Sequence, residues 1–122
     1  MEVVAVLALF QELQIKGSER VSLDDVQDRC NAIVRNILGW QVRVQTSTFC
    51  EVIKRLQAFG LVKMQVERTK ITDNVHLQLG VYKDDIANGF KDKDYVHTIA
   101  AGFAPLRELF QGTQDALDLK EN

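Results

Sequence analysis

The chain has 122 residues, of which 46% are apolar and 26% are charged, a composition typical of one ordinary globular domain. One Pro, seven Gly and no low-complexity tract exclude a wholly disordered chain. No apolar run approaches the roughly 20 residues needed to span a bilayer, so we expect no transmembrane helix. Two cysteines without CxxC spacing exclude a disulfide-rich scaffold and a zinc ribbon, and they indicate a reducing compartment.

The net charge of −2 conceals an uneven distribution along the chain. Residues 1–40 carry four Lys or Arg against six acids, and residues 84–122 carry four against eight. Residues 41–83 instead carry seven Lys or Arg against three acids. The middle third is therefore the one basic region, which is where we expect any contact with phosphates.

Two helices are predicted in the first third of the chain. Apolar residues recur at three- and four-residue steps from Glu2 to about Ile15, which predicts a helix buried along one stripe. The pattern Ser22-x-x-Asp25 is a capping signal, and it opens a second helical run that ends at Gly39.

A third helix is predicted over residues 47–59. Thr48 and Glu51 fit a capping box at its start, and apolar residues up to Phe59 form one buried stripe. Gly60 stands where a left-handed cap would end the helix.

After this helix the apolar period changes from 3.6 to 2, which predicts two strands, around residues 62–66 and 75–79. The segment between them supplies turn chemistry and places Arg68 and Lys70 at a positively charged tip. The sequence thus predicts a β-hairpin with a long basic loop.

Short helices are predicted in the last third. The first, within YKDDIANGF, has an acidic cap and turns Ile86 and Phe90 inward. Asp94 is expected to cap the next helix, and Pro105 to break it or to start another turn. Residues from 112 onward are expected to fray.

Three helices followed by a hairpin are the order of a winged helix, an α+β fold with a helix-turn-helix core and a β-hairpin wing, here with extra C-terminal helices. In that arrangement the third helix enters the major groove and the wing lies along the DNA backbone. The basic region coincides with these two elements. The candidate DNA-binding residues are Ser47, Thr48, Lys54, Arg55, Lys63, Arg68 and Lys70.

Two segments resemble a known family. QTSTFCEVIKRLQAFGLVKM and LGVYKDDIANGFKDKDYVHTIAAGF are similar to the C-terminal winged-helix domain of the origin recognition complex large subunit and of the related cell-division-cycle replication initiator. The acidic pair Asp84 and Asp85, followed by a short helix and Lys91-Asp92-Lys93, is the most particular part. The resemblance covers roughly residues 3–103, which we expect to form the winged-helix domain, with 104–122 as a partly helical extension.

The resemblance implies a function in DNA replication. In that family the domain lies at the carboxyl end of an AAA+ ATPase and contacts origin DNA or other initiator and helicase subunits during helicase loading in the nucleus. This sequence has no GxxxxGK[ST], so we expect no ATP binding by these residues. It also lacks a nucleophile elbow and HExxH, and we expect neither an enzyme nor a bound cofactor.

Single residues with functional chemistry have simpler interpretations. Trp40, between two helices, is expected in the core. His76 and His97 have no third ligand at a suitable spacing, so we expect no metal site. Cys30 and Cys50 are expected to be buried, inert thiols.

Two alternatives stay open at this stage. The same fold would serve as a protein-interaction module, docking to initiator or helicase subunits with little DNA affinity, which suits the acidic last third. A small transcription regulator would require a dimerisation helix at one end, for which the tail is a weak candidate. For the initiator hypothesis we expect a monomer that binds double-stranded DNA with marked salt dependence.

Overall fold

The structure is a computed structural model, and it describes residues 1–68 and 73–111. Its elements in chain order are α1 (Glu2–Lys16), β1 (Val21–Ser22), α2 (Leu23–Ala32), the π-helix η1 (Ile33–Ile37), α3 (Thr46–Ala58), β2 (Val62–Arg68), β3 (Asp73–Leu79), α4 (Lys83–Phe90) and α5 (Asp94–Ala101). Residues 104–111 are also helical. The predictions for Lys70 and for residues 112–122 lie outside the described residues.

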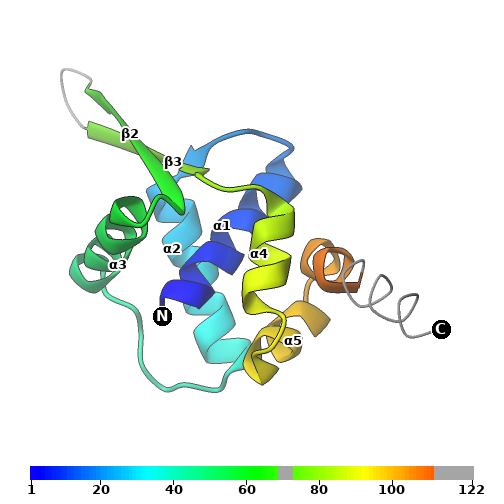
Figure 1. The fold of residues 1–122 in the computed structure, drawn as a ribbon. Coiled ribbons are helices and arrows are strands. Elements are labelled where there is room, and N and C mark those ends of the chain that lie inside the picture. The colour runs from blue at the N-terminus through cyan, green and yellow to red at the C-terminus, as the bar shows by residue number, and fades with distance from the viewer. Residues whose placement is uncertain (69–72, 112–122) are drawn as a thin grey trace.

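The first helix is the centre of the molecule. All ten residues from Val4 to Leu13 are buried, because α2, α3, η1 and the sheet all pack against α1 (Figure 1). A helix that is apolar on all sides is typically surrounded by other elements. The prediction of a helix here is confirmed, but burial along a single stripe was too narrow an expectation.

The second helix begins as its capping signal predicted. The Ser22 hydroxyl accepts a hydrogen bond from the Asp25 backbone N–H at 3.2 Å. The helix does not stay regular to its end, since it passes into the π-helix η1, a rare geometry that occurs often at functional sites. Gly39 follows with φ 68°, a left-handed conformation that glycine adopts without strain.

The third helix ends in a Schellman turn. Gly60 has φ 78°, its N–H donates to the Gln57 carbonyl at 3.0 Å, and the Leu61 N–H donates to the Leu56 carbonyl at 2.9 Å. The predicted left-handed cap is confirmed. The predicted place of Phe59 in the buried stripe is wrong, because Phe59 is 78% exposed at the point where the helix stops.

The predicted hairpin is formed by β2 and β3, which pair antiparallel with Val62 opposite Leu79 and Met64 opposite Leu77. A short strand that the sequence did not predict, β1, pairs with the other edge of β3, where Val21 lies opposite Leu77. The sheet order is therefore β1-β3-β2. Its apolar face packs on the core, and its polar face carries Lys63.

The hairpin and the end of α3 meet at a close contact between two glycines. The Gly80 N–H donates to the Leu61 carbonyl at 2.8 Å, and a Cβ added to Gly80 would overlap the carbonyl oxygen of Gly60. The start of β2 and the end of β3 are therefore held against the helix end.

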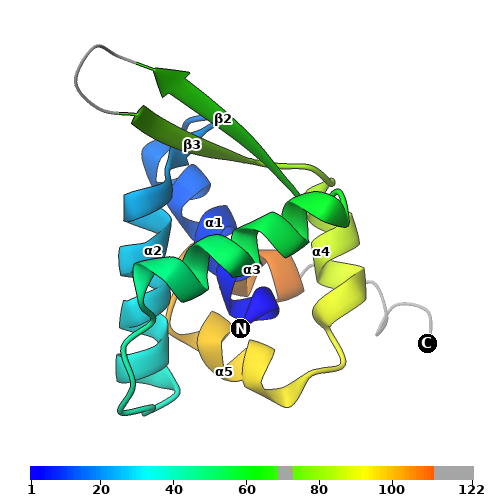
Figure 2. The same ribbon diagram turned by 90° about the vertical axis from the view of Figure 1, so that its left-hand side faces the viewer.

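The C-terminal helices close the core on the side of α1 away from α3 (Figures 1 and 2). Asp85 accepts a hydrogen bond from the Tyr82 N–H at 3.3 Å, so the first of these helices has its predicted acidic cap. Asp94 is the first residue inside α5 rather than its cap, which is Lys93. The helical segment 104–111 contributes buried side chains to the same core.

The described residues thus form an α+β fold, with helices packed around α1 and a three-stranded antiparallel sheet at one edge (Figure 1). This order of elements is compatible with a winged-helix arrangement.

Candidate nucleic-acid interface

The outer face of α3 is the centre of the candidate interface. Figure 2 shows this helix lying across one face of the molecule, with the β2–β3 hairpin beside it. Its inward side chains are Phe49, Val52, Ile53 and Leu56, all buried. Its exposed polar side chains include Ser47, Thr48, Glu51, Lys54 and Arg55.

The hydroxyl residues at the start of α3 are placed differently from the prediction. The helix begins at Thr46, after Gln45, and Gln45 makes no side-chain cap. The predicted capping box of Thr48 and Glu51 is therefore wrong, because Thr48 already lies within the first turn. The exposed hydroxyls of Ser47 and Thr48 are consequently not occupied as helix caps.

The two cations of α3 are not equivalent. The Nη2 atom of Arg55 lies 3.1 Å from Oε1 of Glu2, so its charge is shared with a carboxylate of α1. The pKa of the Glu2 carboxyl is lowered, first by a hydrogen bond from its own backbone and then by nearby positive charges that include Arg55. Lys54 is exposed and forms no ion pair within the part of the chain that the structure describes.

The hairpin contributes one further cation whose position is described. Lys63 is exposed on β2, opposite Gln78 on β3. Directly opposed residues share a sheet face, so Lys63 and Gln78 lie on the polar face together. Arg68 ends β2 opposite Asp73, but its side chain, like the whole of Lys70, lies outside the described residues.

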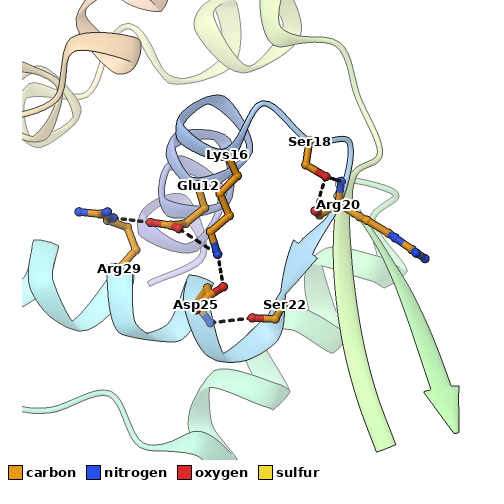
Figure 3. A network of polar contacts seen from close by, with 7 residues as sticks. All are labelled: Glu12, Lys16, Ser18, Arg20, Ser22, Asp25 and Arg29. Carbon is orange, nitrogen blue, oxygen red and sulfur yellow. Dashed lines mark hydrogen bonds and ion pairs between the residues drawn. The ribbon is translucent and has the colours of Figure 1, made fainter. Parts of the chain in front are cut away.

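Lys16 of α1 and Arg29 of α2, in contrast, form ion pairs with acidic residues of the same two helices. Nε of Arg29 lies 2.6 Å from Oε1 of Glu12, a buried carboxylate, and Nζ of Lys16 contacts both Glu12 and Asp25 (Figure 3). The Arg29 guanidinium also lies 5.4 Å from the centre of the Phe103 ring. This network joins α1 to α2, and its cations are paired with carboxylates of the protein itself.

Four aromatic residues in the described part of the chain are exposed, and the least exposed of them is Tyr95, at 39%. Trp40 is 45% exposed, so the prediction that it belongs to the core is wrong. Phe59 and Tyr82 are 78% and 83% exposed, and each lies within two residues of the contact between Gly60 and Gly80. Both residues therefore expose aromatic surface near the junction of α3 with the hairpin.

The two cysteines differ in burial. Cys30 is buried, and burial raises the pKa of its thiol to about 12, which makes it a poor nucleophile. Cys50 is only partly buried, contrary to expectation. Among the described residues, no three His, Cys, Asp or Glu side chains lie together as a metal site, and no helix there is long and apolar enough to cross a membrane.

Comparisons with known proteins do not extend this description. No protein-family model matches the chain, and no curated protein matches it.

Proposed function

We propose that this chain is a winged-helix DNA-binding module that contacts duplex DNA through α3 and the hairpin wing. The observation that carries the proposal is the pair of exposed lysines on these adjoining elements, Lys54 and Lys63, which no acid in the described structure neutralises. The hydroxyls of Ser47 and Thr48 do not cap this helix, so they add free hydrogen-bonding groups at its start. Phosphate contacts of this kind set affinity and register more than sequence preference.

Base readout by this face is expected to be limited. Bidentate recognition of bases in the major groove uses Arg, Lys, Asn or Gln side chains. Arg55 is paired with Glu2, and Glu51 on the outer face would repel a phosphate. We therefore expect weak binding that depends strongly on salt and little on sequence.

The biological assignment rests on the sequence resemblance alone. We propose that the module belongs to a nuclear DNA replication initiator of the origin recognition complex type, and that it contacts origin DNA during helicase loading.

The test is fluorescence anisotropy of a labelled duplex over a range of salt concentrations. Wild type is expected to bind with a log K that falls as log salt rises, by about 0.9 for each phosphate contact. A Lys54→Gln/Lys63→Gln variant should lose about two contacts from that slope. The matched control is Lys93→Gln/Arg107→Gln, which removes two exposed charges from the C-terminal helices and should bind as wild type does. If the two double variants bind equally, the proposal is wrong.

A second candidate function is supported by the exposed aromatic pair. Phe59 and Tyr82 lie at one junction, and aromatic side chains of this kind are the common anchors of protein interfaces. In this alternative the domain docks to other initiator or helicase subunits and has little DNA affinity. A folded wild-type chain that fails to bind duplex even at low salt would favour it.

A further inference from the structure

The linker between η1 and α3 is held in place by polar side chains of α2. Oδ1 of Asn31 accepts a hydrogen bond from the Val44 N–H at 2.7 Å, and the Val44 carbonyl accepts one from Nε2 of Gln27 at 3.3 Å. At the other end, the Trp40 N–H donates to the Val34 carbonyl at 2.9 Å. Hydrogen bonds therefore hold the linker to η1 at Trp40 and to α2 at Val44.

Two adjoining hollows, each of about 480 Å³, run along this linker to the start of α3. Volumes of this size are within the range of small-ligand sites. The first is lined by residues that include Arg35, Asn36, Trp40, Gln41 and Arg43. The second shares Arg43 and adds side chains with amide or hydroxyl groups, among them Gln27, Gln45, Thr46 and Ser47.

The two hollows together form one groove, which we call the linker groove, and the charged side chains that line it are all positive. Its lining holds two arginines, Arg35 and Arg43, and no carboxylate. The sequence from Asn31 to Cys50 contains no Asp or Glu at all. Neither arginine forms an ion pair within the described ranges 1–68 and 73–111. The groove therefore favours an anionic ligand.

The uncharged groups of the lining restrict the kind of anion. Trp40 exposes nearly half of its surface beside the arginines, and an indole ring offers a face on which a nucleic-acid base can stack. The amides of Asn36 and Gln41 can hydrogen-bond to base edges. A chain of Asp or Glu alone would satisfy the arginines but has no aromatic ring to stack on the indole.

We propose that this groove binds a short single strand of nucleic acid, with Trp40 stacked on a base and Arg35 and Arg43 holding phosphates. The groove offers no feature that selects between ribose and deoxyribose, so the shared chemistry is that of an unpaired polynucleotide. The groove shares Ser47 with the duplex-binding face but does not include Lys54 or Lys63, and the proposal does not depend on duplex binding.

Trp40 is the only tryptophan in the chain, so its emission reports on this groove directly. The probes are hexathymidylate and hexauridylate, which do not form duplexes with themselves. Both are expected to quench the emission saturably, with a log K that falls with log salt by about 0.7 for each phosphate contact. A preference for one probe would show selection by the sugar or by the thymine methyl group and would still support the proposal.

An Arg35→Gln/Arg43→Gln variant keeps the fluorophore and should bind at least tenfold more weakly, with a salt slope smaller by about 1.4 for the two lost contacts. The control variants Lys93→Gln/Arg107→Gln and Lys54→Gln/Lys63→Gln should bind the strand as wild type does. All the substituted side chains are exposed, so the variants should fold, as circular dichroism would verify.

The proposal would be overturned by no quenching by either strand, by equal affinity of wild type and the Arg35→Gln/Arg43→Gln variant, or by displacement of the strand by an equal concentration of hexaglutamate. Loss of strand binding in the Lys54→Gln/Lys63→Gln variant would also overturn it, because the strand would then lie on α3 and not in the linker groove.

Discussion

Replacement of Gly80 by alanine tests the contact that holds the hairpin against the end of α3. The added Cβ would overlap the Gly60 carbonyl oxygen and lie 3.0 Å from its carbonyl carbon and 3.1 Å from that of Leu61. These atoms are backbone, so no side-chain rotation can relieve the overlap. The backbone itself must move, at the point where Gly60 adopts its left-handed conformation.

The magnitude follows from what that movement disturbs. Overpacking in a well-packed region costs about 1–3 kcal/mol. The displaced segment also carries the bond from Gly80 to Leu61 and the Schellman bond from Leu61 to Leu56, and each contributes about 1 kcal/mol. We therefore expect the free energy of unfolding of Gly80→Ala to fall by about 3 kcal/mol, or roughly 10 °C in Tm for a domain of this size.

The assay is urea unfolding followed by circular dichroism, with Gly89→Ala as the matched control. Gly89 is exposed within α4, and a Cβ there would meet no atom within 4 Å. Alanine should therefore raise the free energy of unfolding by about 0.5–1 kcal/mol, because glycine is the poorer helix former. The expected role of this contact is refuted if the free energy of unfolding of Gly80→Ala lies within 0.5 kcal/mol of the wild-type value while the control behaves as expected.

Three further predictions concern stability and reactivity. The hydrogen bond from Lys16 lowers the pKa of Asp25 below its ordinary value of 3.8. The contribution of the Lys16–Asp25 pair to the free energy of unfolding is therefore present at pH 7 and is lost as pH falls through the lowered pKa. Asp25→Asn should thus cost about 0.5 kcal/mol in urea unfolding at pH 7, a small value because the pair is exposed, and progressively less as the pH falls through the lowered pKa. In the native protein an aromatic disulfide reagent at pH 8 should modify Cys50 quickly and Cys30 only after unfolding, and fast labelling of both would contradict the burial of Cys30. Gln11→Leu should raise the free energy of unfolding by about 1 kcal/mol, since the buried Oε1 of Gln11 has no hydrogen-bond partner, and a loss of stability in thermal unfolding would show that this amide is satisfied.

The sequence predicts best those helices and strands whose buried apolar residues recur at the helical or the strand period. The helix of residues 46–58 and the two strands after it appear where their apolar residues recur at the helical and strand periods. Local capping groups are predicted well where they act alone, as with Ser22 and Gly60. The predicted cap at Thr48 is wrong because the helix already begins at Thr46, whose hydroxyl accepts a hydrogen bond from Gln27 of α2, a long-range contact that no local pattern reveals.

Long-range contacts also explain the other differences. Strand β1 has two residues, too few for a visible alternation, and it is held by pairing with β3. Trp40 was expected in the core because most tryptophans are largely buried, yet Trp40 is exposed, whereas Val44 is buried where Gln27 and Asn31 bond to its backbone. Phe59 is exposed because α3 ends at Ala58, the residue before it.

The candidate interface was predictable only in part. Helical spacing predicts that Lys54 and Arg55 point outward, and both are exposed. It does not predict that Glu2 on α1 pairs with Arg55, because the two residues are distant in sequence. The linker groove was not predicted, although the absence of acids from Asn31 to Cys50 was a signal present in the sequence.

The most direct test of the DNA-binding proposal is a titration of the ¹⁵N-labelled chain with a short duplex, followed through the backbone amide chemical shifts. The proposal predicts that the largest shift changes fall on α3 and β2, at residues such as Ser47, Thr48, Lys54 and Lys63. Changes centred on Phe59, Tyr82 and α4 instead, or no changes at low salt, would contradict it.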